Sequence, residues 1–157
     1  MDELDPELSR AVDVRYRRTV RTYFLFILVS AATAVAGSMM VPPVSSAGTT
    51  VTMPIWVLVF FLAVSAIVAR RFLTRWERLR DIKLLRGFEG LLSALQFNII
   101  AISAMSLLIV VAGVASGIYS ADRGDVFRSV VISLIVFALN FPRLSTWKTI
   151  ASNLKDV

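Results

Sequence analysis

The sequence has no cysteine and no histidine among its 157 residues. Their absence excludes disulfide frameworks, thiol nucleophiles, thiolate or imidazole metal sites and haem ligation by histidine. An Asn-x-Ser/Thr glycosylation acceptor is missing as well. We therefore expect no metal and no cofactor.

Charged residues are also scarce. They make up 18% of the chain, against about a quarter in a soluble domain, and the mean hydropathy is +0.74. The run from Tyr23 to Val41 has no charge at all. A helix of this length crosses the roughly 30 Å hydrocarbon core of a bilayer, and a backbone in lipid must satisfy its own hydrogen bonds. We therefore expect an integral membrane protein.

The long apolar runs predict an all-α fold, a four-helix transmembrane bundle in one membrane domain. The expected spans are 22–41, 53–69, 91–119 and 126–141, with an outer loop at 42–52, a basic segment at 70–90, an outer turn at 120–125 and a tail at 142–157. Trp147 and Lys148 of the tail are expected near the headgroups. The third span is longer than a bilayer needs and is expected to tilt or project. The fourth is short, and its Arg128 must reach the near interface.

The first 21 residues are polar and carry a helix-start signal. Asp5 can cap a helix whose first residue is Pro6. An apolar stripe with a four-residue period follows, formed by Leu4, Leu8, Val12 and Tyr16. It indicates an amphipathic helix, either on the membrane surface or continuous with the first span; a disordered terminus is the alternative. Residues 45–47 resemble a cleavage site, but the long acidic leader argues against a signal peptide.

Positive charge predicts the orientation. Of the 17 Lys and Arg residues, five precede the first span, seven lie between the second and third spans and three follow the fourth. Only two, Arg123 and Arg128, lie between the third and fourth spans. Because cytoplasmic loops are enriched in Lys and Arg, both termini and the basic segment are expected in the cytoplasm. The lack of Cys and His leads us to expect a prokaryotic inner (plasma) membrane protein.

The basic segment is the first candidate site. Its candidate contact residues are Arg70, Arg71, Arg75, Trp76, Arg78, Arg80, Lys83 and Arg86. They can dock a partner protein or anionic lipid headgroups, or they can serve only as a topology signal. The second span is expected to continue into this segment as a helix, with Glu77–Arg80 and Arg78–Asp81 pairs, until Gly87 or Gly90 lets the chain turn back. Together these features predict a basic helical hairpin.

Small and polar residues on the faces of three spans are the second candidate site. The faces are Ser30, Thr33, Ala34 and Gly37; Gln96, Ser103, Ser106, Gly113 and Gly117; and Ser129, Ser133 and Asn140. They indicate either close helix packing, including self-association, or a polar path through the bundle. Asn98 lies on another face of its span, where it can meet a neighbouring subunit or water.

The sequence has few patterns that are typical of transport or catalytic sites. No Asp, Glu, Lys or Arg lies at the centre of a span, which disfavours proton-coupled and ion-coupled transport. No phosphate-binding loop and no Ser-x-x-Lys or Gly-x-Ser-x-Gly arrangement is present. Asp122 and Asp125 in the outer turn are the nearest thing to a carboxylate pair, and we interpret them as solvated turn residues.

These patterns favour a non-enzymatic, small multi-pass membrane protein. We expect an accessory, assembly or regulatory subunit that acts through helix–helix and cytoplasmic-face contacts with a membrane protein partner. The alternative is a homo-oligomeric channel or passive transporter with a hydroxyl-lined path, and the remote alternative is a membrane-embedded lipid-modifying enzyme. The positive charge is expected to meet anionic headgroups of the bilayer rather than nucleic acid.

Overall fold

The fold is all-α, as the sequence predicts. We analysed a computed structural model, which describes residues 6–42 and 52–154. Within these ranges the chain forms five helices and no strand. Most of the predicted outer loop, Asp5 and Leu4 lie outside the described residues.

Helix α1, Pro6–Met40, joins the amphipathic N-terminal segment and the first apolar run in one helix of 35 residues. Proline fits the first helical position because its missing N–H would have no partner there. Val12 is fully buried, and Tyr16 packs against the same core. The apolar stripe therefore contacts other helices, and the helix is continuous with the first predicted span.

Helix α2, Thr52–Leu73, extends beyond the predicted span through Arg70 and Arg71. It then ends, so the expected uninterrupted helix into the basic segment is wrong. Two side chains satisfy carbonyls of its last turn: Thr74 Oγ1 donates to Arg70 O at 2.7 Å, and Asn98 Nδ2 donates to Leu73 O at 3.3 Å. Asn98 is buried, and its side chain supports the end of α2.

Helix α3, Trp76–Ser120, has 45 residues and bends at Gly87, where φ is +67° and ψ is −171°. This combination is accessible almost only to glycine, which has no Cβ. The bend separates a short basic arm, residues 76–86, from the long apolar part of the helix. Gly87, and not Gly90, is the turning point.

Replacing Gly87 with Ala is expected to lower the free energy of unfolding by about 1–3 kcal/mol, because a Cβ is strained at this φ and ψ even though the space around it is open. Unfolding in mixed micelles of increasing SDS content measures the change. The control is Ser93→Ala, an exposed position on the same helix that should be nearly neutral. Equal stability of G87A and wild type would contradict the bend.

Helix α4 comprises Arg123–Leu139. Its N-cap is Asp122, whose carboxylate accepts a hydrogen bond from the Gly124 N–H at 2.7 Å. The fourth span was predicted to reach Phe141, but the helix ends two residues earlier. The reason is Pro142, because its ring disfavours helical geometry at the preceding residue. Asn140 takes the C-cap position instead.

Helix α5, Leu144–Asn153, occupies what was expected to be a simple tail. Trp147, predicted to anchor at the headgroups, is 3% exposed and lies in the core with Ile150, Ala151 and Leu154. These four positions follow the i, i+3, i+4, i+7 spacing of one helix face. Burying that face against α1 and α3 explains why the tail folds back.

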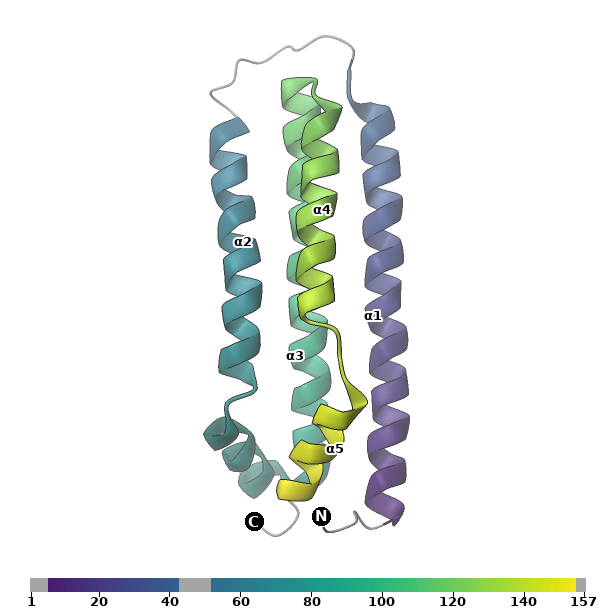
Figure 1. Cartoon of the computed structure of the whole chain (residues 1–157), viewed down its shortest axis with the longest axis vertical. Helices are drawn as coiled ribbons and strands as arrows, with labels where there is room; N and C mark the ends of the chain where they lie inside the picture. Colours follow the sequence, from purple (N-terminus) through teal and green to yellow (C-terminus); the bar gives the residue numbers. More distant parts are fainter. Residues whose placement is uncertain (1–5, 43–51, 155–157) are drawn as a thin grey trace.

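Helix α3 is the central element. It packs against α1, α2 and α4, whereas α1 and α2 lie on opposite sides and make no contact with each other among the described residues (Figure 1). Helix α1 begins and α5 ends at the same end of the molecule (Figure 1). We call this the basic end, made of the first turns of α1, residues 70–90 and α5. The opposite end, at the α3–α4 connection, is the turn end.

Three helices are long and apolar enough to cross a membrane: α1, α2 and α3. Helix α4 has 17 residues, about 25 Å at 1.5 Å per residue, which falls short of the hydrocarbon core. Together α4 and α5, bent by 40°, make a possible fourth span. Most large apolar side chains of α2 point outward, including Phe60, Phe61 and Val68, as in a helix surrounded by lipid.

Candidate functional site

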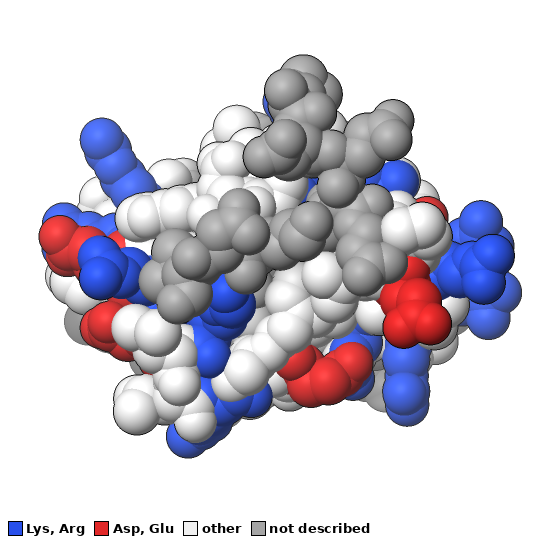
Figure 2. All heavy atoms as spheres, turned by 90° about the horizontal axis from the view of Figure 1, so that it is seen from below, with Lys and Arg blue, Asp and Glu red and all other residues white. Residues whose placement is uncertain are grey.

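The candidate contact residues of the basic segment lie at the basic end. Arg70 and Arg71 belong to the last turn of α2, Arg75 is the N-cap of α3, and the rest lie on the basic arm. Arg71, Arg75, Trp76, Arg78, Arg80 and Arg86 are exposed, whereas Arg70 and Lys83 are half-buried. Figure 2 looks onto this end and shows Lys and Arg spread around its rim, with Asp and Glu between some of them.

The ion pairs at this end differ from those expected. Among the described residues, neither Glu77–Arg80 nor Arg78–Asp81 forms a pair. Exposed pairs gain little against the entropy of two long side chains, so such spacing alone does not ensure one. The pairs that form join different helices: Arg15 to Glu89 at 2.6 Å and Lys148 to Asp13 at 3.3 Å.

The basic arm is fixed from its inner side. Leu79 is fully buried in the core formed with α1 and α5, and Lys83 Nζ donates a hydrogen bond to the Leu154 carbonyl. On the outer side Leu84 and Leu85 are 57% and 84% exposed beside the arginines. An amphipathic surface of leucine and arginine is typical of a helix in the headgroup region of a bilayer.

The predicted polar faces of α3 and α4 meet each other. Ser103, Ser106, Ser129 and Ser133 are buried, and each hydroxyl donates to a backbone carbonyl. The Ser133 hydroxyl crosses from α4 to Ser106 O of α3 at 2.8 Å. All four hydroxyls therefore have partners within the chain: three donate within their own helix, and Ser133 joins α4 to α3.

The glycines permit close approach of backbones. A Cβ on Gly113 would lie 1.9 Å from Ser129 Oγ, and one on Gly117 would lie 2.8 Å from Val126, both on α4. A Cβ on Gly37 would lie 2.3 Å from Val114 of α3. The Gly113-x-x-x-Gly117 motif thus contacts α4 of the same chain.

The other residues of the predicted polar faces differ in their burial and hydrogen bonding. Ser30 is buried and its hydroxyl has no partner among the described residues, while Thr33, Ala34 and Gln96 are half-buried. Asn140 is 6% exposed, and its Nδ2 donates to Val136 O at 2.8 Å. Asn140 is the C-cap of α4, seven residues after Ser133.

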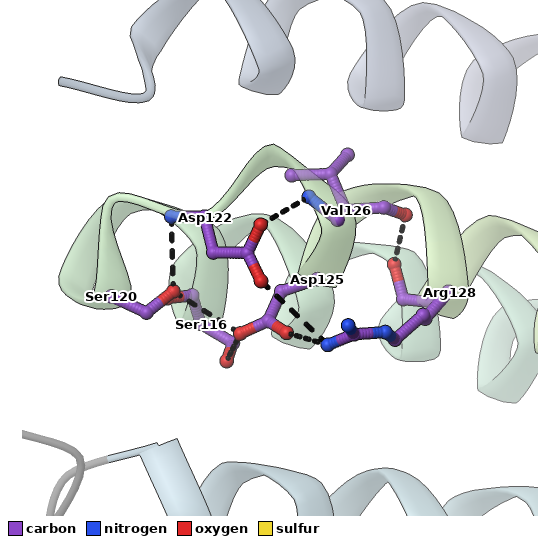
Figure 3. A network of polar contacts seen from close by, with 8 residues as sticks. Ser116, Ser120, Asp122, Asp125, Val126 and Arg128 are labelled. Carbon is purple, nitrogen blue, oxygen red and sulfur yellow. Dashed lines mark hydrogen bonds and ion pairs between the residues drawn. The ribbon is translucent and has the colours of Figure 1, made fainter. Parts of the chain in front are cut away.

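Asp125 is the main departure from the sequence interpretation, because it is 5% exposed and not a solvated turn residue. Its Oδ2 accepts hydrogen bonds from Ser116 at 2.6 Å and Ser120 at 3.2 Å, and its Oδ1 lies 2.9 Å from Arg128 Nη1 (Figure 3). Asp122 stays half-exposed as the cap of α4. One carboxylate therefore joins α3 to α4 at the turn end.

Within residues 6–42 and 52–154, no three Asp or Glu side chains lie close enough together to hold a metal ion. Asp125 is already satisfied by two hydroxyls and a guanidinium. Its arrangement serves helix association, since a buried carboxylate requires such partners.

Comparison with protein family models, with curated proteins and with solved structures finds no match to this chain.

Proposed function

We propose that the protein is a multi-pass protein of the cell membrane whose basic end faces the cytoplasm. The distribution of Lys and Arg supports this orientation, since fifteen of the 17 fall in segments at the basic end or the adjacent termini. Four crossings, the fourth formed by α4 and the uncharged residues up to Pro142, would bring both termini to that side. The headgroups at this side are anionic, which matches the charge.

We propose that the protein acts as a non-enzymatic accessory, assembly or regulatory subunit. One observation carries this proposal: the basic arm presents exposed arginines that pair with no described carboxylate, and its inner side packs against α1 and α5. Leu79 and Lys83 anchor the arm to α1 and α5. A partner with an acidic surface would meet a preorganised basic one, so little ordering entropy opposes binding.

The homo-oligomeric channel and the lipid-modifying enzyme have less support. The serines that would line a path already donate to backbone carbonyls inside the α3–α4 contact. The one buried carboxylate, Asp125, is occupied by Ser116, Ser120 and Arg128.

The proposal is tested by extracting the native particle in a mild detergent and identifying its components by mass spectrometry. The triple variant Arg75→Glu, Arg78→Glu and Arg80→Glu is expected to reduce recovery of the partner by about tenfold or more, since like charges across an interface cost several kcal/mol. Membrane insertion should be unchanged.

A matched control reverses three exposed arginines of α1: Arg10→Glu, Arg17→Glu and Arg18→Glu. The change in net charge is identical, so a loss restricted to the arm variant identifies the arm as the docking surface. Full recovery of the partner with the arm variant would overturn the docking role. A native particle that is a homo-oligomer of this chain would overturn the subunit proposal and favour the channel, whereas a lone monomer would count against both.

A further inference from the structure

A pocket of about 60 Å³ lies at the basic end between the last turn of α2, α3 and the α4–α5 junction. Its polar lining consists of Arg70, Thr74, Asn98, Asn140, Arg143 and Thr146, and the remaining wall is aliphatic or aromatic. A single water needs about 10–15 Å³ of such space, so the pocket has room for several water-sized groups but not for a whole lipid.

One residue of the pocket lining carries a buried acceptor. Asn140 is 6% exposed, and its Oδ1 has no hydrogen-bond partner among the described residues. The orientation of the amide is fixed by Nδ2, which donates to Val136 O at 2.8 Å, because the reversed amide would place two oxygens together. A buried oxygen left unpaired costs free energy, so this site favours a ligand that brings a donor.

The charge of the lining favours an anion. Arg70 and Arg143 line the pocket, and none of its lining residues is acidic. Thr146 and Trp147 come from the first turn of α5, whose N-terminus has no side-chain cap. Free N–H groups and the helix dipole at such an N-terminus attract negative charge.

The positions of Arg70 and Arg143 in the sequence indicate that the anion is a lipid headgroup. Arg70 follows the uncharged part of α2, residues 52–69, and Arg143 follows the uncharged residues 129–142. Both arginines therefore mark the level where hydrocarbon gives way to headgroups. Leu73, Ile99 and Phe141 supply apolar wall beside them, against which an acyl chain can pack.

We propose that this pocket binds the headgroup of one anionic phospholipid, a phosphodiester that also carries a hydroxyl donor. The phosphate lies between Arg70 and Arg143, the hydroxyl donates to Asn140 Oδ1, and the acyl chains stay outside along α2 and α4. This site is separate from the docking surface on the basic arm and does not depend on a protein partner.

The test uses the full chain in a non-ionic detergent, titrated with phosphatidylglycerol and followed by native mass spectrometry. The double variant Arg70→Gln and Arg143→Gln is expected to bind the lipid at least about tenfold more weakly, because two charge-assisted contacts are lost. The matched control, Arg17→Gln and Arg18→Gln, removes the same charge from exposed arginines of α1 outside the pocket and should change affinity less than about twofold. Equal weakening in both double variants would overturn the proposal.

The hydroxyl contact is tested separately with phosphatidylmethanol, which keeps the phosphodiester but has no headgroup hydroxyl. Wild-type protein is expected to prefer phosphatidylglycerol by about fivefold or more, and Asn140→Leu to remove that preference. Equal binding of the two lipids by wild type would overturn the role of Asn140. Displacement of the lipid by millimolar inorganic phosphate would assign the pocket to soluble anions and overturn the lipid assignment.

Discussion

Replacing Asp125 with Ala is expected to lower the free energy of unfolding by about 2–3 kcal/mol. The substitution leaves the Ser116 hydroxyl, which is fully buried, without its 2.6 Å acceptor. It also removes the carboxylate that pairs with Arg128 across one turn of α4. Unfolding of the purified protein by SDS in mixed micelles, monitored by circular dichroism, measures the loss.

Two further variants make this result specific. Asp81→Ala removes an exposed carboxylate that forms no ion pair among the described residues, and it is expected to change stability by less than about 0.5 kcal/mol. Asp125→Asn keeps an acceptor for Ser116 and should fall between D125A and wild type. A D125A protein as stable as D81A would show that the buried carboxylate does not hold α3 to α4.

Replacing Gly113 with Ala is expected to destabilise the protein by about 1–3 kcal/mol, although alanine is the better helix former. The new Cβ would lie 1.9 Å from Ser129 Oγ and 2.1 Å from Ser129 Cβ. Since the Ser129 side chain is fully buried, α3 and α4 must move apart to accommodate the methyl group. The same SDS titration detects the change.

The exchanged pair Gly113→Ala with Ser129→Gly provides the decisive comparison. It moves the small residue from α3 to α4 and removes both close contacts, so it should recover most of the stability that G113A loses. Ser129→Gly alone is the control for lost packing on α4. If the double variant is no more stable than G113A, the penalty arises elsewhere than at this contact.

The helical class and the membrane-spanning runs could be predicted from sequence because hydrophobicity along a helix is a local property. The run from Tyr23 to Val41 indicates a helix by length alone. Helix α5 was missed for a different reason. Its face of Trp147, Ile150, Ala151 and Leu154 is visible in the sequence, but the position of Trp147 near a membrane end suggested an anchor.

The candidate site was less predictable because it depends on contacts between distant segments. Nothing local distinguishes Asp125, which is buried, from Asp122, which is half-exposed three residues earlier. Only the approach of α3 brings Ser116 and Ser120 to one of them. The pocket at the basic end likewise combines residues from α2, α3, α4 and α5, and only the fold brings Asn98 and Asn140 together.

The central position of α3 imposes an order on assembly. Helices α1 and α2 emerge first during synthesis, yet they share no contact in the described structure, because α3 lies between them. The first two helices therefore share no packed surface, and neither can be packed before α3 is present. Leu79 and Leu91 of α3 pack with Val12 of α1, whereas Ile109 of α3 packs in a separate cluster with α2.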